Sequence, residues 1–129
     1  MDLVNYFKNI KGKGVLATAD DQGHVDVALY ARPHLIDKDT VAFIMPDHLT
    51  HQNLQANIHA AYLFIEEGPG YKGIRLFLSK VREEGDSELL RSIRRRAYAT
   101  EQGGKETSRF LVFFEVTKTL PLIGPGKEE

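Results

Sequence analysis

The sequence predicts a mainly β protein: a small barrel of six antiparallel strands with a few flanking helices. Two observations support this prediction. Apolar or alternating segments of strand length recur along the 129 residues, and most connections between them are short and rich in turn-forming residues. Helical periodicity is confined to three places. Short connections favour antiparallel pairing, and closing the sheet into a barrel leaves no exposed edge.

Composition limits the class of protein. The chain is 42% hydrophobic and 27% charged with a net charge of −1, so we expect residues 1–129 to form a single domain. The near-neutral charge predicts no general attraction to nucleic acid or to an anionic membrane. The absence of Cys excludes disulfides and thiolate zinc sites. There is no signal-peptide pattern and no apolar run near the roughly 20 residues of a membrane helix, so a cytoplasmic location is expected.

The first half of the chain predicts a helix, two strands and a hairpin. Asp2 is a suitable helix cap, and apolar residues follow it at helical spacing up to Ile10. Strands are predicted over 14–20 and 24–30, and a hairpin is predicted around 37–39. In the second strand an apolar set alternates with a mixed set, which predicts one buried side. The apolar set is Val25, Val27 and Leu29, and the mixed set is Asp26, Ala28 and Tyr30.

The second half predicts two helices between strands. A short helix is predicted from Thr50, because Thr is a good cap and Leu54 gives an inward anchor. Strands are predicted over 59–65, 74–83 and 109–120. Between the last two, residues 86–104 carry an apolar stripe and end in a Gly pair, which predicts a helix.

The segment from His48 to Asn53 is the first candidate site, and local pattern leaves three interpretations open. His48 and His51, with His59 as a third, could bind a metal, although no Cys completes the set. The segment could be a capped surface helix. The free N–H groups and dipole of a helix starting at Thr50 could also bind a phosphate group.

Tyr30 and Arg32 form the second candidate site. They lie two residues apart, so they are expected to project to the same side of the strand. Arg can bind a phosphate through two N–H groups, and Tyr can stack or hydrogen-bond. The alternative is a surface Tyr beside a solvated Arg.

A third candidate site is the run that contains Arg91, Arg94 and Arg95, which could contact nucleic acid. Acidic residues lie just upstream, however, so a solvated helix face is the simpler interpretation. We find no self-contained catalytic constellation, so a cofactor is expected to supply any chemistry.

Taken together, the segments 14–33, 40–57 and 60–80 resemble the pyridoxamine 5′-phosphate oxidase-like FMN-binding split barrels, most closely the small FMN-binding proteins. The resemblance implies a six-stranded antiparallel Greek-key split barrel and a homodimer with FMN in a cleft at the interface. It also implies a small-molecule or protein redox partner, and the near-neutral charge leads us to expect neither nucleic acid nor a membrane as a partner. The chain ends soon after its last strand, so pyridoxamine 5′-phosphate oxidase activity itself is not expected.

The resemblance also suggests cofactor-binding residues. The strand that runs along the flavin corresponds to Val27, Ala28, Leu29 and Tyr30, whose backbone groups would pair with the ring edge. Thr50 corresponds to the hydroxyl that contacts the phosphate, and Asn53 to the Asn of the same stretch. Leu49 stands where a basic residue is common, so the cationic role is assigned to Arg32, with His48 or His51 assisting.

The implied function is electron transfer or a small flavin-dependent oxidoreductase activity. Two alternatives remain at this point: a split barrel that binds a deazaflavin or haem, and a non-enzymatic module that uses its arginine-rich helix on nucleic acid.

Overall fold

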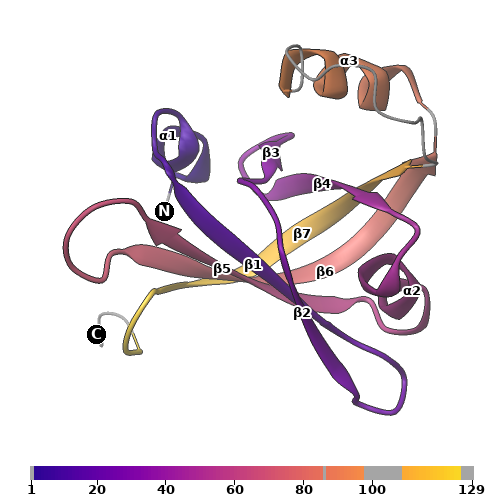
Figure 1. Cartoon of the computed structure of the whole chain (residues 1–129), viewed down its shortest axis with the longest axis horizontal. Coiled ribbons are helices and arrows are strands. Elements are labelled where there is room, and N and C mark those ends of the chain that lie inside the picture. Colours follow the sequence, from indigo (N-terminus) through magenta and orange to yellow (C-terminus); the bar gives the residue numbers. More distant parts are fainter. Residues whose placement is uncertain (1, 86, 98–108, 126–129) are drawn as a thin grey trace.

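Seven antiparallel strands form one sheet in the order β2-β1-β5-β6-β7-β4-β3 (Figure 1). The computed structural model describes residues 2–85, 87–97 and 109–125. The strands are β1 (Gly12–Ala19), β2 (Val25–Leu29), β3 (His34–Leu35), β4 (Thr40–Pro46), β5 (His59–Glu66), β6 (Gly73–Gly85) and β7 (Arg109–Pro121). The helices are α1 (Leu3–Phe7), α2 (Leu49–Ala56) and α3 (Glu88–Ala97).

The mainly β, antiparallel prediction is confirmed, with seven strands in place of six. The additional strand is β3, two residues long, which pairs with β4 to form the predicted hairpin. The strand order places β2 and β3 at opposite ends of the sheet, although they are neighbours in sequence. The segment between them therefore crosses from one end of the sheet to the other.

The strands curl around a core of large side chains. Its centre is aromatic: Phe43 lies 5.0 Å from Tyr62 and 5.9 Å from Phe114, measured between ring centroids. A smaller cluster lies on the other face of β7, where Leu90 and Ile93 of α3 cover Leu111 and Phe113. The successive apolar residues of β7 thus serve two cores, one inside the barrel and one beneath α3.

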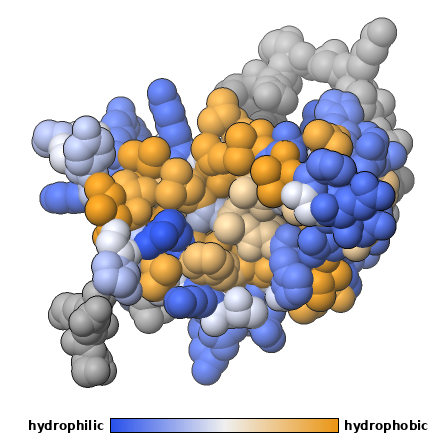
Figure 2. Space-filling view, turned by 90° about the horizontal axis from the view of Figure 1, so that it is seen from below, coloured by the Kyte–Doolittle hydropathy of each residue, from blue (hydrophilic) through white to orange (hydrophobic). Residues whose placement is uncertain are grey.

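The alternation predicted for β2 is present, but its apolar side faces outward. Val25, Val27 and Leu29 are 81%, 67% and 79% exposed, whereas Asp26 and Ala28 are half-buried. The prediction that the apolar side of β2 is buried is therefore wrong for the single chain, in which this side is exposed to solvent. Alternation fixes the period of a strand, but it does not fix which side meets the core. Figure 2, seen from the side on which β2 lies in Figure 1, shows a broad hydrophobic area edged by hydrophilic residues.

The end of α1 and the start of α2 differ from those predicted, since α1 ends at Phe7 and does not extend to Ile10. α2 begins at Leu49 with His48 as its N-cap, so Thr50 is not the cap but lies buried in the first turn. α3 spans Glu88–Ala97, and the rest of the helix predicted to residue 104, with its Gly pair, lies outside the described residues. No helix in the part of the chain that the structure describes is long and apolar enough to cross a membrane.

Gly14 provides the space in which the barrel and the crossing segment meet. A Cβ atom there would overlap the Tyr62 hydroxyl and lie against the Tyr30 carbonyl. Gly14→Ala is therefore expected to lower stability by about 1–3 kcal/mol, as overpacking does. Gly85→Ala is the matched control, because its Cβ would meet the Phe110 ring at an ordinary 3.5 Å. Thermal unfolding of both variants checks this, and equal melting temperatures would contradict it.

Candidate functional site

The first turn of α2 lies beside β2 and the start of β7. Helix α2 packs against β1, β2 and β4, and the end of β4 leads into it. In the β4–β7 ladder Pro46 is opposite Arg109, so the register brings Arg109 to the β4–α2 junction. Tyr30, just beyond β2, reaches the same place. Burial raises the pKa of the Tyr30 phenol above its ordinary value. A hydrogen bond with the Thr50 side chain and the charge of Arg109 act in the opposite direction, but they do not outweigh burial.

Arg109 has an unused buried donor. Its Nε is buried and has no hydrogen-bond partner among the described residues. A buried N–H without an acceptor is costly, and such atoms are rare in native structures. A buried guanidinium with an unused donor at the β4–α2 junction therefore suits an anion better than it suits a closed apolar core.

The start of α2 supplies further donors. Its N-cap, His48, is exposed and makes no side-chain hydrogen bond to the helix. The N–H groups of the first turn therefore lack a side-chain cap, and the helix dipole places partial positive charge there. At the second turn Asn53 is buried and donates to the Thr18 hydroxyl at 3.1 Å, which fixes α2 to β1. The predicted residues Thr50 and Asn53 thus lie on the inner side of the helix.

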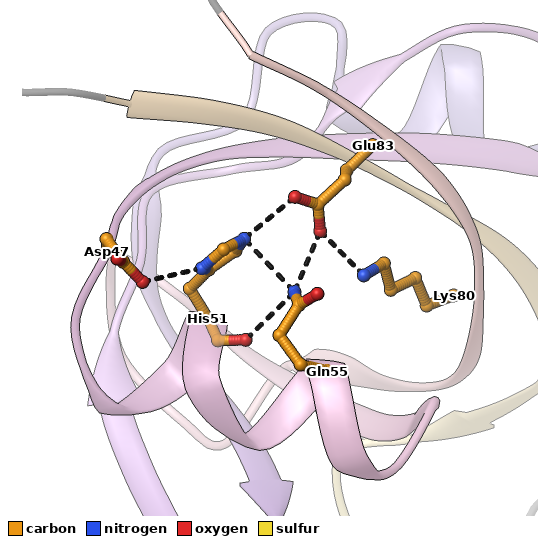
Figure 3. Close-up of polar contacts among 5 residues, drawn as sticks. All are labelled: Asp47, His51, Gln55, Lys80 and Glu83. Atoms are coloured by element: carbon orange, nitrogen blue, oxygen red, sulfur yellow. Dashed lines mark hydrogen bonds and ion pairs between the residues drawn. The ribbon is translucent and has the colours of Figure 1, made fainter.

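His51 connects α2 to the sheet (Figure 3). Its Nδ1 lies 2.8 Å from Asp47 Oδ1 and its Nε2 lies 2.9 Å from Glu83 Oε2. The Gln55 amide nitrogen also lies 3.1 Å from His51 Nε2, so the ring is surrounded by polar groups on both nitrogens. The ring also stacks on Phe110 of β7, with centroids 4.0 Å apart. This arrangement holds the first turn of α2 against β6 and β7.

The metal interpretation of this segment gains no support. Both ring nitrogens of His51 already face carboxylate oxygens, and His48 is exposed at the helix cap. Within residues 2–85, 87–97 and 109–125, no group of three or more His, Asp or Glu side chains is arranged to hold a metal ion.

The predicted flavin-edge strand is an edge strand of the sheet, with β1 as its neighbour. The Tyr30 N–H donates to the Gly14 carbonyl at 3.0 Å. Because backbone groups alternate in direction along an antiparallel strand, those of Ala28 also face β1. The backbone groups of Val27 and Leu29 face the open edge, so two of the four predicted residues present free backbone groups.

The structure places Arg32 away from α2. Its Nη1 donates to the Phe7 and Ile10 carbonyls, at 2.9 and 2.8 Å, and so ties the crossing segment to the end of α1. In Figure 1, α1 and α2 lie on opposite sides of the barrel. Among the described residues, the β4–β7 register instead brings the cation of Arg109 to the β4–α2 junction, and the sequence reasoning missed it. The strand pairing of residues 40–46 with 109–115 would have revealed it.

The arginine-rich helix is described only in part. Arg91 forms an ion pair with Glu88 at 3.1 Å, and the side chains of Arg94 and Arg95 lie outside the described set. The pairing agrees with a partly neutralised helix face.

Glu83 gives the His51 cluster a measurable dependence on acid. Burial raises the pKa of the Glu83 carboxyl, but hydrogen bonds from Lys80, Gln55 and His51 outweigh burial and hold it at about 2, below its usual 4.5. The unfolded chain therefore binds more protons between these values, and this contribution to stability is present above about pH 4.5 and lost towards pH 2.

Glu83→Gln is expected to lower the melting temperature near neutral pH, and the deficit should shrink as the pH falls below about 4.5. Lys80→Gln, which removes one of the partners and keeps the carboxylate, should show a weaker dependence. Thermal unfolding from pH 7 to pH 3 measures both. A deficit for Glu83→Gln that stays constant with pH would contradict the role of the carboxylate.

The chain is similar in structure to several solved proteins. One is an FMN-binding protein from Syntrophomonas wolfei subsp. wolfei, with a TM-score of 0.71 and 20% identity over 87% of this chain and 78% of that one. An F420 reductase has a TM-score of 0.68 and 18% identity, over 84% of this chain and 89% of that one. A putative pyridoxamine 5′-phosphate oxidase from Lactobacillus delbrueckii has a TM-score of 0.61 and 18% identity, over 91% and 88%.

No family model matches the sequence, and no curated protein matches it. The structural similarity nevertheless extends over most of each chain, and the antiparallel strand arrangement is the one that the sequence resemblance implied. The chain therefore has the split-barrel fold of the pyridoxamine 5′-phosphate oxidase-like proteins.

Proposed function

We propose that this protein binds FMN and functions in electron transfer or as a small flavin-dependent oxidoreductase, with a small-molecule or protein redox partner. The observation that carries the proposal is the buried Nε of Arg109, which has no partner among the described residues and lies at the junction of β4 with the uncapped first turn of α2. Tyr30 interacts both with the Thr50 side chain and with the Arg109 charge at the same junction. Solved structures of the same fold include an FMN-binding protein, which supports a flavin-type cofactor.

The donors at this place fit a phosphate. A dianionic phosphate needs several hydrogen bonds and positive charge, and a guanidinium, a hydroxyl and helix N–H groups supply both. Arg109 and Thr50 would hold the phosphate. The buried hydrogen bond between Asn53 and Thr18, together with the His51 cluster, would keep the helix in position. Leu49, where a basic residue was expected, leaves the positive charge to come from β7.

The ring of the flavin would lie along the open edge of β2. The free backbone groups of Val27 and Leu29 are the hydrogen-bonding groups available there. A bound flavin supplies the electron-transfer chemistry, and the protein orients it and sets its surroundings.

We also propose that a second copy of this chain covers the outer face of β2, giving a homodimer. The exposed row of Val25, Val27 and Leu29 continues across the outer sides of β1 and β5, where Val15, Ala17 and Leu63 lie half-buried. A contiguous exposed hydrophobic area of this kind is typical of protein–protein contacts. Residues 110–114 of β7 (FLVFF) are another apolar segment that could form a dimer contact. One face of this segment already packs in the barrel core, and the other face is covered by α3.

A deazaflavin is the second candidate cofactor, because an F420 reductase is among the proteins of similar structure. The two candidates share a phosphate-bearing chain, so the site residues alone do not separate them. The absorption spectrum of the purified protein does, since flavin and deazaflavin absorb differently between the near ultraviolet and the blue. Colourless protein that shows no change on titration with FMN or with a deazaflavin would contradict the flavin proposal altogether.

Arg109→Ala is expected to weaken FMN binding by at least about tenfold, because a charge-assisted contact to the phosphate is lost. Arg32→Ala is the matched control, since Arg32 binds the end of α1 instead. Fluorescence titration of FMN measures both affinities. Equal losses in the two variants, or a larger loss for Arg32→Ala, would show that the phosphate is placed wrongly.

The double variant Val27→Asp and Leu29→Asp is expected to be monomeric, because two carboxylates would be buried in the proposed contact. Ile123→Asp, at a similarly exposed apolar position beyond the end of β7, should leave the dimer intact. Light scattering after gel filtration gives the molecular masses. A wild-type monomer at micromolar concentration, or a double variant that stays dimeric, would contradict the proposed interface.

A further inference from the structure

A large cavity lies on the side of the molecule away from α2. Its volume is about 900 Å³, and α1, the segment around β3, and α3 line it. These three elements stand together at the top of Figure 1, whereas α2 lies at the lower right. The volume is in the range of sites that bind small organic molecules. It does not include Thr50, Tyr30 or Arg109, so it is separate from the proposed phosphate site.

The polar side chains that line this cavity are basic. They are Lys8, Arg32 and His34, and no acidic side chain lines it among the described residues. Two of these side chains, Lys8 and Arg32, carry a positive charge, and cationic groups at the wall of a cavity favour an anionic ligand.

Arg32 is held in one orientation by main-chain acceptors. Its Nη1 donates to both the Phe7 and the Ile10 carbonyl, which uses the two hydrogens of that nitrogen. The Nε and Nη2 hydrogens remain on the other edge of the guanidinium, and no described residue accepts from them. Two parallel N–H groups at that spacing match the two oxygens of a carboxylate.

The remaining walls are apolar. Phe7, Leu35 and Ile93 form inner parts of the lining, and Val4, Ile36 and Leu89 expose a large fraction of their side chains at it. Exposed apolar side chains around a concave, basic site indicate a ligand that has an apolar body as well as a negative charge.

We propose that this cavity binds a small organic carboxylate with an apolar body. Its carboxylate pairs with the free edge of Arg32 and the Lys8 ammonium, and its body contacts Val4, Ile36 and Leu89. This binding is independent of the proposed flavin site, and its test requires no flavin.

The test uses the full chain as purified, with sodium octanoate as the probe and octylamine as the probe of opposite charge. Amide chemical shifts in ¹H–¹⁵N spectra are followed during each titration. Octanoate is expected to cause saturable shifts at Lys8, Arg32, Ile36 and Leu89, and octylamine is expected to bind at least about tenfold more weakly.

Two variants test the two parts of the site. Arg32→Gln removes the cation, and its spectrum shows whether α1 stays folded. Val4→Asp keeps Arg32 and its contacts but places a carboxylate in the wall, so it should weaken octanoate binding by about tenfold even if Arg32→Gln fails to fold. Val81→Asp, at an exposed apolar position on β6, is the control and should bind octanoate as the wild type does.

Three results would overturn the proposal: no saturable shifts, equal binding of octanoate and octylamine, or unchanged octanoate affinity in Val4→Asp. Shifts at the same residues on raising the protein concentration without octanoate would also overturn it, because a second copy of the chain would then cover the cavity.

Discussion

The hydroxyl of Tyr62 fixes the segment on which both candidate sites depend. Tyr62 lies fully buried in the barrel, and its hydroxyl donates towards the Tyr30 and Ala31 carbonyls, at 3.2 and 2.9 Å. Burial raises the pKa of this phenol, so the hydroxyl keeps its proton and remains a donor. These carbonyls belong to the segment that crosses from β2 to β3. The segment has no strand partner at this point, and the single Tyr62 O–H, shared between the two carbonyls, is the hydrogen bond that holds it to the barrel.

The crossing segment explains why two residues expected to act together lie apart. Tyr30 and Arg32 would share one side if the strand continued, but β2 ends at Leu29. Beyond that point Tyr30 turns towards Phe43 and Thr50, whereas Arg32 turns to the carbonyls at the end of α1. A spacing of two residues predicts a common direction only inside a ladder, and hydrogen bonds to Tyr62 and α1 decide the directions outside it.

The sequence was sufficient for what depends on local pattern, and insufficient for what depends on pairing. Alternation and turn residues located the strands, the β3–β4 hairpin and the helix that follows β4, because neighbouring residues determine these features. Arg109 could not be recognised as part of the Thr50 site, because its position follows from the β4–β7 register. The role of His51 was hidden for the same reason, since Glu83 and Phe110 come from distant strands.

The outward apolar row of β2 connects the two parts of the proposed function. In Val27 and Leu29 the side chains form the exposed face, and the backbone groups of the same residues face the open edge. A second chain that packs on this face would hold the strand rigid at the place where a ring edge would form hydrogen bonds. Ordering a strand costs conformational entropy, and whichever partner binds first bears most of that cost. Cofactor binding and self-association, as proposed, therefore favour each other. A ligand that binds the dimer more tightly than the monomer stabilises the dimer by the difference between its two binding free energies.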